Sequence, residues 1–330
     1  MIRDAVWGNE MSHIKHRANV RVRTGDRAWL LIALLVALFV TTPPSRAASA
    51  SQRSFATPEE ASAALLQAVE AHNRGAVLAV LGNDAAQWIS SGDATADRAT
   101  SDRFAAAYNT KHAIAVAGDK ATLTTGSDDY PFAFPLVKSG DRWRFDTAAG
   151  KEEMLARRIG ANELDAIKVL EAIVDAQYDY ASADRDADGV RTYARKFVSS
   201  KGKRDGLYWP TKAGEPPSPL GPFVAEATRE GYGKKGSAPT PYHGYYYKLL
   251  DGQGKQAASG ALDYVVHGRA IGGFAVVAYP AKYGNSGIMT FIVNQDGKVY
   301  QSDLGPQTEA RASALRRYDP GPGWTLAGQR

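Results

Sequence analysis

The sequence contains no cysteine, and this absence sets the first limits on the protein. Without cysteine the chain can form no disulfide bond, no zinc site built on cysteine and no lipid anchor on a thiol. A folded form must therefore be stabilised by packing, or by a metal ion bound through other side chains.

Familiar catalytic motifs are also missing from the sequence. It has no HExxH zinc motif, no GxSxG nucleophile turn and no Walker phosphate loop. His243 and His267 are the histidines of the C-terminal half, and each precedes a glycine. A general base or a metal ligand is conceivable at either position, but no nucleophile or carboxylate stands at a recognisable spacing from them. The pattern therefore favours a structural or hydrogen-bonding role.

Excess charge is scarce outside the N-terminus. The formal net charge of +5 is concentrated in residues 1–50, which carry seven Lys and Arg against three Asp and Glu. The remainder of the chain has 33 basic residues against 32 acidic ones. This balance argues against nucleic acid as a partner of the folded part.

The long apolar run of the sequence lies at residues 28–40 and follows a basic stretch. It is shorter than the roughly 20 residues that a membrane-spanning helix needs. Small residues at Ala48 and Ala50 suit cleavage before Ser51, so we expect residues 1–50 to be a signal peptide, with Met11 as an alternative start. The mature chain is then periplasmic or secreted, without stable membrane insertion. An uncleaved anchor is the alternative.

Residues 55–149 predict a first α+β domain. Thr57, Pro58 and Glu60 form a capping box at the start of a helix that is expected to reach Asn73. A short helix from Gly75 and a third over residues 96–108 follow. Short β-prone runs then predict an antiparallel sheet, with strands at residues 113–116, 121–125, 132–137 and 143–145. This order is similar to the cone-shaped fold named after nuclear transport factor 2. On that fold, five aromatic side chains either line a pocket or fill it: Trp88, Phe104, Tyr108, Trp143 and Phe145.

Residues 150–325 predict a second domain, in which a long helix packs on an antiparallel sheet. Gly160 is expected to end one helix and Asn162 to cap the next, which runs to about residue 183. The core-facing stripe of that helix is expected to comprise Leu164, Ile167, Leu170, Val174, Tyr178 and Ala181.

The connection after this helix and the sheet that follows are defined by composition. We expect a short helix over residues 190–198, an irregular proline-rich segment over residues 210–222 and one or two helical turns at 223–230. The strands are expected at residues 245–250, 274–279, 288–293 and 298–301, with a last helix over residues 309–318.

Several unusual segments resemble an uncharacterised family of exported bacterial proteins, the domain of unknown function number twenty-nine fifty. They are YHGYYYKLL, GGFAVVAYPAKYGNSGIMTFIVN, DGLYW and WRFDTAAGKEEMLARRIGANELDAI. The resemblance covers nearly all of residues 55–325 and implies no activity. The second domain also resembles the globular heads of pilins and pseudopilins. The leader departs from that pattern, because Gly25 precedes Asp26 and Arg27 in place of the processing site that filament assembly needs.

Aromatic and basic side chains mark a candidate binding site in the second domain. Its members are Tyr242, His243, Tyr245, His267 and Arg269. The tyrosines can stack on a sugar or a peptide, but the alternation of a strand directs part of this group into the core.

A calcium site is the second candidate, at Asp184, Asp186 and Asp188. Alternating carboxylates before Gly189 supply the hard oxygen ligands that calcium prefers, and pseudopilin heads similar to this domain hold calcium in a loop. Arg195 stands where an EF-hand loop needs glutamate, so a full EF-hand is not expected. A solvated acidic loop is an equal alternative, and no other cofactor is expected.

We therefore expect an exported, non-enzymatic protein that binds or organises a component of the cell envelope, whether a protein, a peptide or a glycan. The competing hypothesis is a periplasmic hydrolase or small-molecule-binding enzyme that uses the first-domain pocket or His243 and His267.

Overall fold

The computed structural model describes residues 52–185, 187–233 and 240–328, and the predicted signal peptide lies outside this range. The described chain is α+β, as expected, and its residues form one compact unit. Among the described residues, no helix has the length and apolarity needed to cross a bilayer. Likeness to nuclear transport factor 2 or to pilin heads stays a prediction, as does a domain boundary near Gly150.

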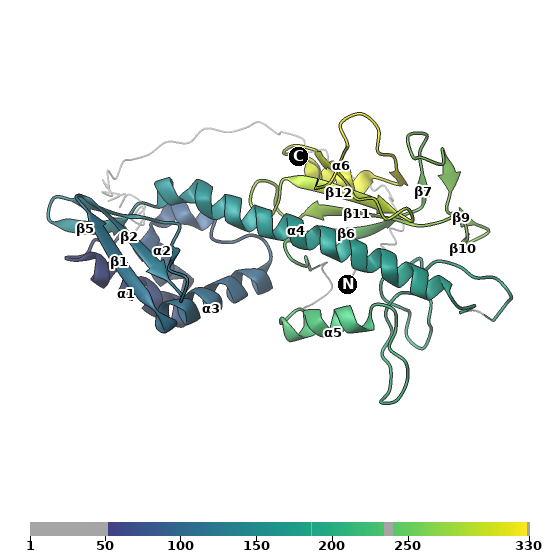
Figure 1. The fold of residues 1–330 in the computed structure, drawn as a ribbon, viewed down its shortest axis with the longest axis horizontal. Helices are drawn as coiled ribbons and strands as arrows, with labels where there is room; N and C mark the ends of the chain where they lie inside the picture. Colours follow the sequence, from purple (N-terminus) through teal and green to yellow (C-terminus); the bar gives the residue numbers. More distant parts are fainter. Residues whose placement is uncertain (1–51, 186, 234–239, 329–330) are drawn as a thin grey trace, which may run out of the picture. The chain divides into compact units, whose positions relative to one another are not determined.

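The N-terminal part contains three α-helices and a short 3-10 helix before its sheet (Figure 1): α1 Pro58–Glu70, α2 Arg74–Leu81, η1 Asn83–Gln87 and α3 Ala94–Thr110. The capping box is confirmed at Thr57, whose hydroxyl accepts from the Glu60 amide at 3.1 Å, while the Glu60 carboxylate reaches back to the Ala56 amide at 3.0 Å. Each of the three predicted helices therefore exists, with its ends shifted by a few residues.

Five antiparallel strands follow: β1 His112–Ala117, β2 Lys120–Thr125, β3 Tyr130–Pro131, β4 Leu136–Ser139 and β5 Arg142–Phe145. They pair in the order β1-β2-β4-β5, and β3 also pairs with β2. The predicted strand over residues 132–137 is wrong in its bounds, because residues 132–135 separate β3 from β4 and only its last two residues belong to β4. Trp88, Tyr108, Trp143 and Phe145 are buried, and Phe104 is half-buried against the same cluster, so these aromatic side chains pack in the interior of this part.

A single helix, α4 Thr147–Ala181, replaces the two predicted helices. Gly160 does not end a helix and Asn162 does not cap one, because the backbone continues through both. The amide of Asn162 instead donates to the Ser286 carbonyl at 2.8 Å. The N-terminal turns of α4 pack on the first core through Met154 and Leu155, and its later turns pack on a second core. One helix thus contributes to two hydrophobic clusters.

The face that α4 buries differs from the predicted stripe. Leu170 and Val174 are buried as expected, but the side chain of Leu164 is 62% exposed and that of Tyr178 is 48% exposed. The buried positions of α4 in the second core are Ala166, Val169, Leu170, Ile173, Val174, Ala176, Gln177 and Tyr180. The stripe is therefore rotated relative to the prediction at its beginning and end.

The connection after α4 is extended, and the helix predicted over residues 190–198 is wrong. Tyr193 pairs with Ala270, and the Gln177 amide satisfies both backbone groups of Ala194, at 2.8 and 2.9 Å. These long-range partners replace helical hydrogen bonds. The proline-rich segment is irregular as expected over residues 210–220, and α5 Gly221–Arg229 begins within its last two predicted residues.

The second sheet has the antiparallel order β15-β13-β12-β11-β6. Its strands are β6 Tyr245–Leu250, β11 Ala275–Pro280, β12 Met289–Asn294, β13 Tyr300–Asp303 and β15 Thr325–Leu326. The smaller elements are β7 Gly252–Gln253, β8 Leu262–Asp263, β9 Val265–Val266, β10 Arg269–Ala270, α6 Thr308–Ala314 and β14 Arg317–Tyr318. The predicted last helix is thus shorter than expected.

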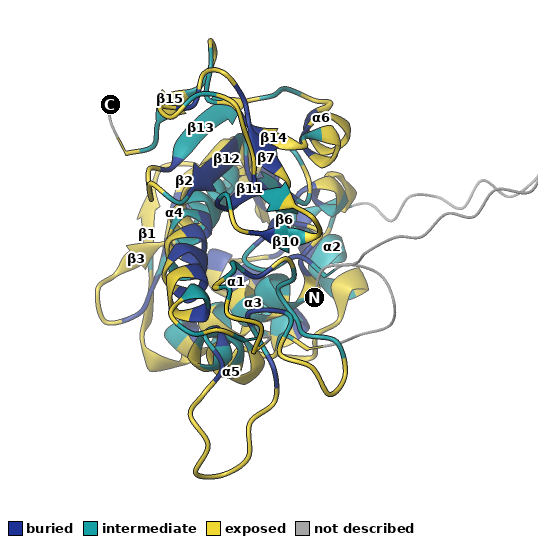
Figure 2. Ribbon diagram, turned by 90° about the vertical axis from the view of Figure 1, so that its right-hand side faces the viewer, coloured by how far each residue is buried: buried dark blue, intermediate teal, exposed yellow. Residues whose placement is uncertain are grey.

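Both faces of this sheet are covered. Successive residues of its central strands point to opposite faces, so both kinds of position are apolar. Val276 and Val293 face the α4 side, whereas Val277 and Ile292 face α6 and β14. Figure 2 shows β11 and β12 as buried strands at the centre of this arrangement. The sheet therefore holds the residues at its edge and in its loops in fixed positions.

Candidate functional site

The five predicted binding residues fall into separate places. Tyr242 and His243 lie in the turn that leads into β6, and both are half-buried. Tyr245 is fully buried in the second core, where its hydroxyl donates to the Met289 carbonyl at 2.9 Å. His267 and Arg269 belong to the β9–β10 hairpin. The structure thus brings Tyr242 and His243 together and places Tyr245 behind them in the core.

The pair His243-Gly244 forms a two-residue turn. Tyr242 and Tyr245 exchange two backbone hydrogen bonds, at 2.9 and 3.1 Å, and the φ angles of His243 and Gly244 are 48° and 74°. Positive φ at both central positions is the requirement of a type I′ turn, which joins twisted antiparallel strands. His267-Gly268 repeats this conformation, with φ angles of 50° and 79°. The glycine after each histidine is therefore a turn signal.

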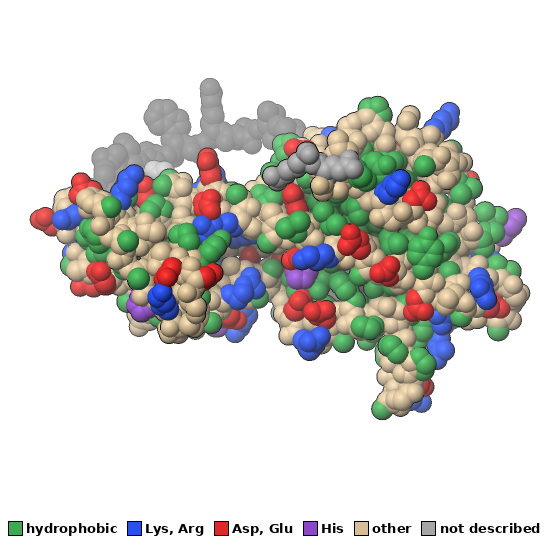
Figure 3. Space-filling model, viewed as in Figure 1, with side chains coloured by type: hydrophobic (Ala, Val, Ile, Leu, Met, Phe, Trp, Pro, Cys, Tyr) green, Lys and Arg blue, Asp and Glu red, His purple; other side chains and the backbone are tan. Residues whose placement is uncertain are grey.

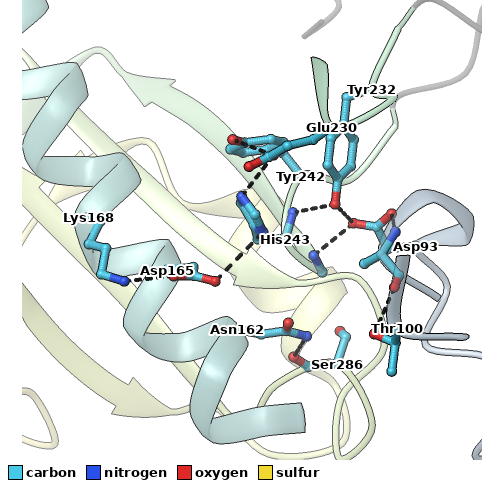
Figure 4. Close-up of polar contacts among 12 residues, drawn as sticks. Asp93, Thr100, Asn162, Asp165, Lys168, Glu230, Tyr232, Tyr242, His243 and Ser286 are labelled. Atoms are coloured by element: carbon cyan, nitrogen blue, oxygen red, sulfur yellow. Dashed lines mark hydrogen bonds and ion pairs between the residues drawn. The ribbon is translucent and has the colours of Figure 1, made fainter. Parts of the chain in front are cut away.

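The ring of His243 lies between two carboxylates (Figure 4). Its Nδ1 is 3.7 Å from Asp165 Oδ2 on α4, and its Nε2 is 3.4 Å from Glu230 Oε2 at the end of α5. Only a protonated imidazole can donate from both nitrogens at once. Because the carboxylates lie at opposite nitrogens, a cation cannot bind both of them and the imidazole together. Asp165 also pairs with Lys168, at 2.9 Å, so acidic and basic side chains alternate from Lys168 to Glu230.

Two tyrosines complete the wall around His243. The hydroxyl of Tyr242 donates to Glu230 Oε2 at 3.1 Å, and the hydroxyl of Tyr232 donates to Asp93 Oδ2 at 2.9 Å. Burial raises the pKa of Tyr242 well above its ordinary range, and Glu230 raises it further. Burial and Asp93 do the same to the pKa of Tyr232. Both phenols therefore stay neutral hydrogen-bond donors at physiological pH.

Asp93 connects this turn to the N-terminal part of the chain, and sequence reasoning missed it. Its carboxylate is 1% exposed and caps α3, since Oδ1 accepts from the amides of Thr95 and Ala96 at 3.1 and 3.0 Å. Its Oδ2 accepts from Gly244 at 3.0 Å and from Tyr232. The Ser-Gly-Asp sequence before α3 could have identified the cap. Nothing local in the sequence identifies the distant partners.

Side chains of α4 hold the loop before β12 beside the same turn. Glu163 Oε1 accepts from the amides of Ile288 and Met289 at 2.9 and 3.0 Å, and Asn162 binds Ser286. The φ of Gly244 favours glycine, and a Cβ there would lie only 2.5 Å from the Asn162 amide nitrogen, so Asn162 would have to shift. The turn at His243 is thus fixed from α3, α4 and α5.

The predicted calcium loop is partly described. Asp184 Oδ2 accepts from the Gly189 amide at 2.7 Å, and Asp188 Oδ1 accepts from the Val190 amide at 3.1 Å. The other oxygen of Asp188 pairs with Arg269. Asp186 lies outside the described residues. Across the residues that the structure describes, no group of three His, Cys, Asp or Glu side chains is arranged to hold a metal ion, and the calcium hypothesis stays a prediction.

The surface around His243 combines aromatic rings with charged side chains. Aromatic rings stand next to carboxylates, since the ring centroids of Phe223 and Tyr242 are 5.3 Å apart and those of Tyr232 and Tyr242 are 4.6 Å apart. Acidic and basic side chains are interspersed on the face that Figure 3 shows, in keeping with the balanced charge. We define the His243 surface as Asp165, Phe223, Glu230, Tyr232, Tyr242 and His243.

Comparison with known proteins gives a family and no activity. No curated protein and no solved structure matches the chain. A family model described as "Protein of unknown function (DUF2950)" matches residues 52–327, which include every described strand and helix and the whole His243 surface. The chain belongs to this family.

Proposed function

We propose that this protein is exported to the cell envelope, where it binds or organises an envelope component without chemical turnover, and that the His243 surface is its binding site. The leader at residues 1–50 supports export, because a basic stretch and a short apolar run precede small residues. The mature chain would then act in the periplasm or outside the cell.

The carboxylates beside His243 are the observation that favours a non-catalytic role. A general base needs a ring nitrogen that is open to the proton it abstracts. Both nitrogens of His243 instead lie within 4 Å of carboxylates, and Asp93 accepts four hydrogen bonds from the chain. The ring nitrogens thus face carboxylates of the chain itself, and the Asp93 carboxylate is already hydrogen-bonded, which supports a role in shaping a surface.

The ligand chemistry follows from what borders the ring. Phe223, Tyr232 and Tyr242 are half-buried and offer aromatic faces and edges, and Glu230 is exposed beside them. Aromatic faces suit the C–H face of a sugar, and carboxylates accept hydrogen bonds from hydroxyl and amino groups. An envelope glycan, or a peptide that carries amino groups, fits this combination.

Co-sedimentation with purified peptidoglycan sacculi tests the proposal. We expect the protein to bind, and Glu230→Gln to weaken binding about 3- to 10-fold, because one charged acceptor is removed. Glu171→Gln is the matched control, since Glu171 is exposed on α4 outside the His243 surface. Equal binding by both variants, or equal binding to phospholipid vesicles alone, would contradict this assignment.

A turnover assay tests the competing hydrolase. The protein is incubated with peptidoglycan, ester and phosphate substrates, and His243→Asn is compared with the unchanged chain. Asparagine adopts positive φ readily, so the turn is kept while the imidazole is lost. Turnover that disappears in this variant would overturn the non-enzymatic proposal.

A further inference from the structure

Strand β1 ends its sheet with an open side. It pairs with β2 from His112↔Thr125 to Ala117↔Lys120, and no other strand pairs with it in the described part of the chain. Five of its six residues are exposed, and the sixth, Ile114, is half-buried. Figure 2 shows β1 as an exposed strand at the margin of the fold.

The groups on the open side follow from the hairpin. Gly118 and Asp119 form a two-residue loop between Ala117 and Lys120. Such a loop is closed by a pair that exchanges two hydrogen bonds, and bonded pairs then alternate along the strands. The backbone groups of Ala113, Ala115 and Ala117 therefore bond to β2. Those of His112, Ile114 and Val116 point away from it.

This edge lacks the usual protection against pairing. Proteins commonly protect an edge strand with lysine, proline, a bulge or a covering segment. The sequence of β1 is HAIAVA, without a charged residue or proline, and its register with β2 is unbroken. The opposite edge of the same sheet is covered, because Phe55 and Trp143 exchange two backbone hydrogen bonds, each of 2.8 Å. One edge of this sheet is thus paired with another segment, and the other edge, β1, is left open.

We propose that β1 is where two copies of this chain associate, by antiparallel pairing about a two-fold axis at Ala115. In this register the bonded pairs are Ile114 with Val116 of the second copy and the reverse, while Ala115 faces Ala115. Cross-strand β-branched pairs are favourable, and alanines beside them allow close approach. The alternation of small and branched residues makes the strand complementary to itself.

Charge supports a second copy as the partner and supports this register. The same pairing brings Lys111 of one copy level with Asp119 of the second, and Asp119 level with Lys111, on either side of the uncharged strand. Lys111 pairs with Asp129 of its own chain at 2.7 Å, and this register places a second carboxylate beside it, whereas like charges would oppose self-association. Six residues a side make a small interface, so the dimer is expected to be weak and concentration-dependent.

Sedimentation equilibrium of the full chain, from micromolar to millimolar concentration, tests the proposal. We expect a monomer–dimer equilibrium whose dissociation constant rises at least about 10-fold in Val116→Lys, because a charge now lies on the paired edge. Val116 is 56% exposed, so the fold tolerates this change. Ile271→Lys is the matched control, since Ile271 is an exposed branched residue outside β1. A monomer at every concentration, or a dimer insensitive to Val116→Lys, would overturn the proposal.

Single cysteines test the register, because the chain has none of its own. Ala115→Cys should form a disulfide-linked dimer under mild oxidation, since directly opposed residues lie about 4.5–5.5 Å apart, within the range of disulfides. Ala113→Cys is the control, because Ala113 faces Ala117 and its two copies would be about 13 Å apart. Equal cross-linking of both variants would rule out the proposed pairing.

Discussion

At the scale of single residues, the short side chain of Asp93 links segments that are far apart in the sequence. It caps α3 with one oxygen and with the other holds Tyr232 and Gly244, which are far from it in the sequence. A buried carboxylate with four donors is stabilising only while all four remain. The His243 surface therefore depends on a residue that is itself inaccessible to a ligand.

Truncation of Asp93 should separate these two roles. We expect Asp93→Ala to lower the free energy of unfolding by about 3 kcal/mol, and Asp93→Ser, which still caps α3, by about 2 kcal/mol. Thr57→Ala, which removes only a helix cap, should cost about 1 kcal/mol. Urea unfolding measures all three. No loss in Asp93→Ser, together with equal losses in Asp93→Ala and Thr57→Ala, would show that the long-range hydrogen bonds contribute nothing.

A second carboxylate, Asp205, predicts a pH dependence. Burial alone would raise its pKa, but hydrogen bonds from Lys196 at 2.8 Å and from Ser200 outweigh burial and lower the pKa from 3.8 to about 2. A lowered pKa means that the ionised group stabilises the folded chain. That stabilisation is complete above pH 3.8 and is lost as the pH falls towards about 2.

The variant Asp205→Asn tests this dependence. Its melting temperature should lie below that of the unchanged chain at neutral pH, and the difference should shrink between pH 4 and pH 2. Differential scanning calorimetry at a series of pH values supplies the comparison. A difference that is constant across this range would mean that the charge of Asp205 does not contribute to stability.

At the scale of elements, α4 provides matched glycines. A Cβ at Gly150 would lie 2.4 Å from the Ala133 carbonyl oxygen, whereas at Gly160 nothing lies within 4 Å. We expect Gly160→Ala to stabilise the chain by about 0.5–1 kcal/mol, because alanine favours the helix. Gly150→Ala should destabilise it by about 1–3 kcal/mol through overpacking. Thermal unfolding of the pair checks both signs, and a stabilised Gly150→Ala would contradict the close contact.

The two leucines of α4 provide a second matched pair. Leu170 is fully buried and Leu164 is 62% exposed, although both belong to the predicted stripe. Leu170→Asp should cost several kcal/mol, because an unpaired carboxylate is buried. Leu164→Asp should change stability by less than about 0.5 kcal/mol. Circular dichroism and urea unfolding distinguish them, and similar losses in both would return Leu164 to the core.

The exposure of Leu164 shows where periodicity fails. At this level of α4 the adjacent Glu163 turns toward the sheet and accepts from two backbone amides at the start of β12. The backbone amides of Ile288 and Met289 need an acceptor, so Glu163 faces them where the apolar stripe had predicted a contact by Leu164. The same reason explains residues 190–198, because the backbone groups of Ala194 bind the Gln177 amide and Tyr193 pairs with Ala270, both distant in sequence. Local patterns identified most strands, the Thr57 cap and the cover of the sheet. They placed a cap wrongly at Asn162 and could not identify these partners.

At the scale of the whole molecule, the candidate site was predictable only in part. Tyr242 and His243 were found because aromatic residues and histidine are recognisable in any sequence. Asp165 and Glu230 looked like ordinary surface residues of helices, and only the fold brings them to the two nitrogens of one ring. Their significance depends on α4, α5 and the turn before β6 meeting at one place.

The unfolding of the described chain should be one transition. Because α4 contributes Leu155 to one hydrophobic cluster and Leu170 to the other, loss of either cluster exposes part of the same helix. We expect the calorimetric and van't Hoff enthalpies to agree within about 10%.

The division near Gly150 can be tested in the same sample by limited proteolysis. Two resolved transitions would show that the halves are independent despite the shared helix.

The attachment of α4 at both ends also bears on how fast a ligand could bind. The stretch that carries Asn162, Glu163 and Asp165 lies between the two clusters, so it has little freedom to rearrange. Association would then require no slow step within the protein. The observed rate constant should rise linearly with ligand concentration without reaching a plateau, and its size should follow diffusion and the charge of the ligand.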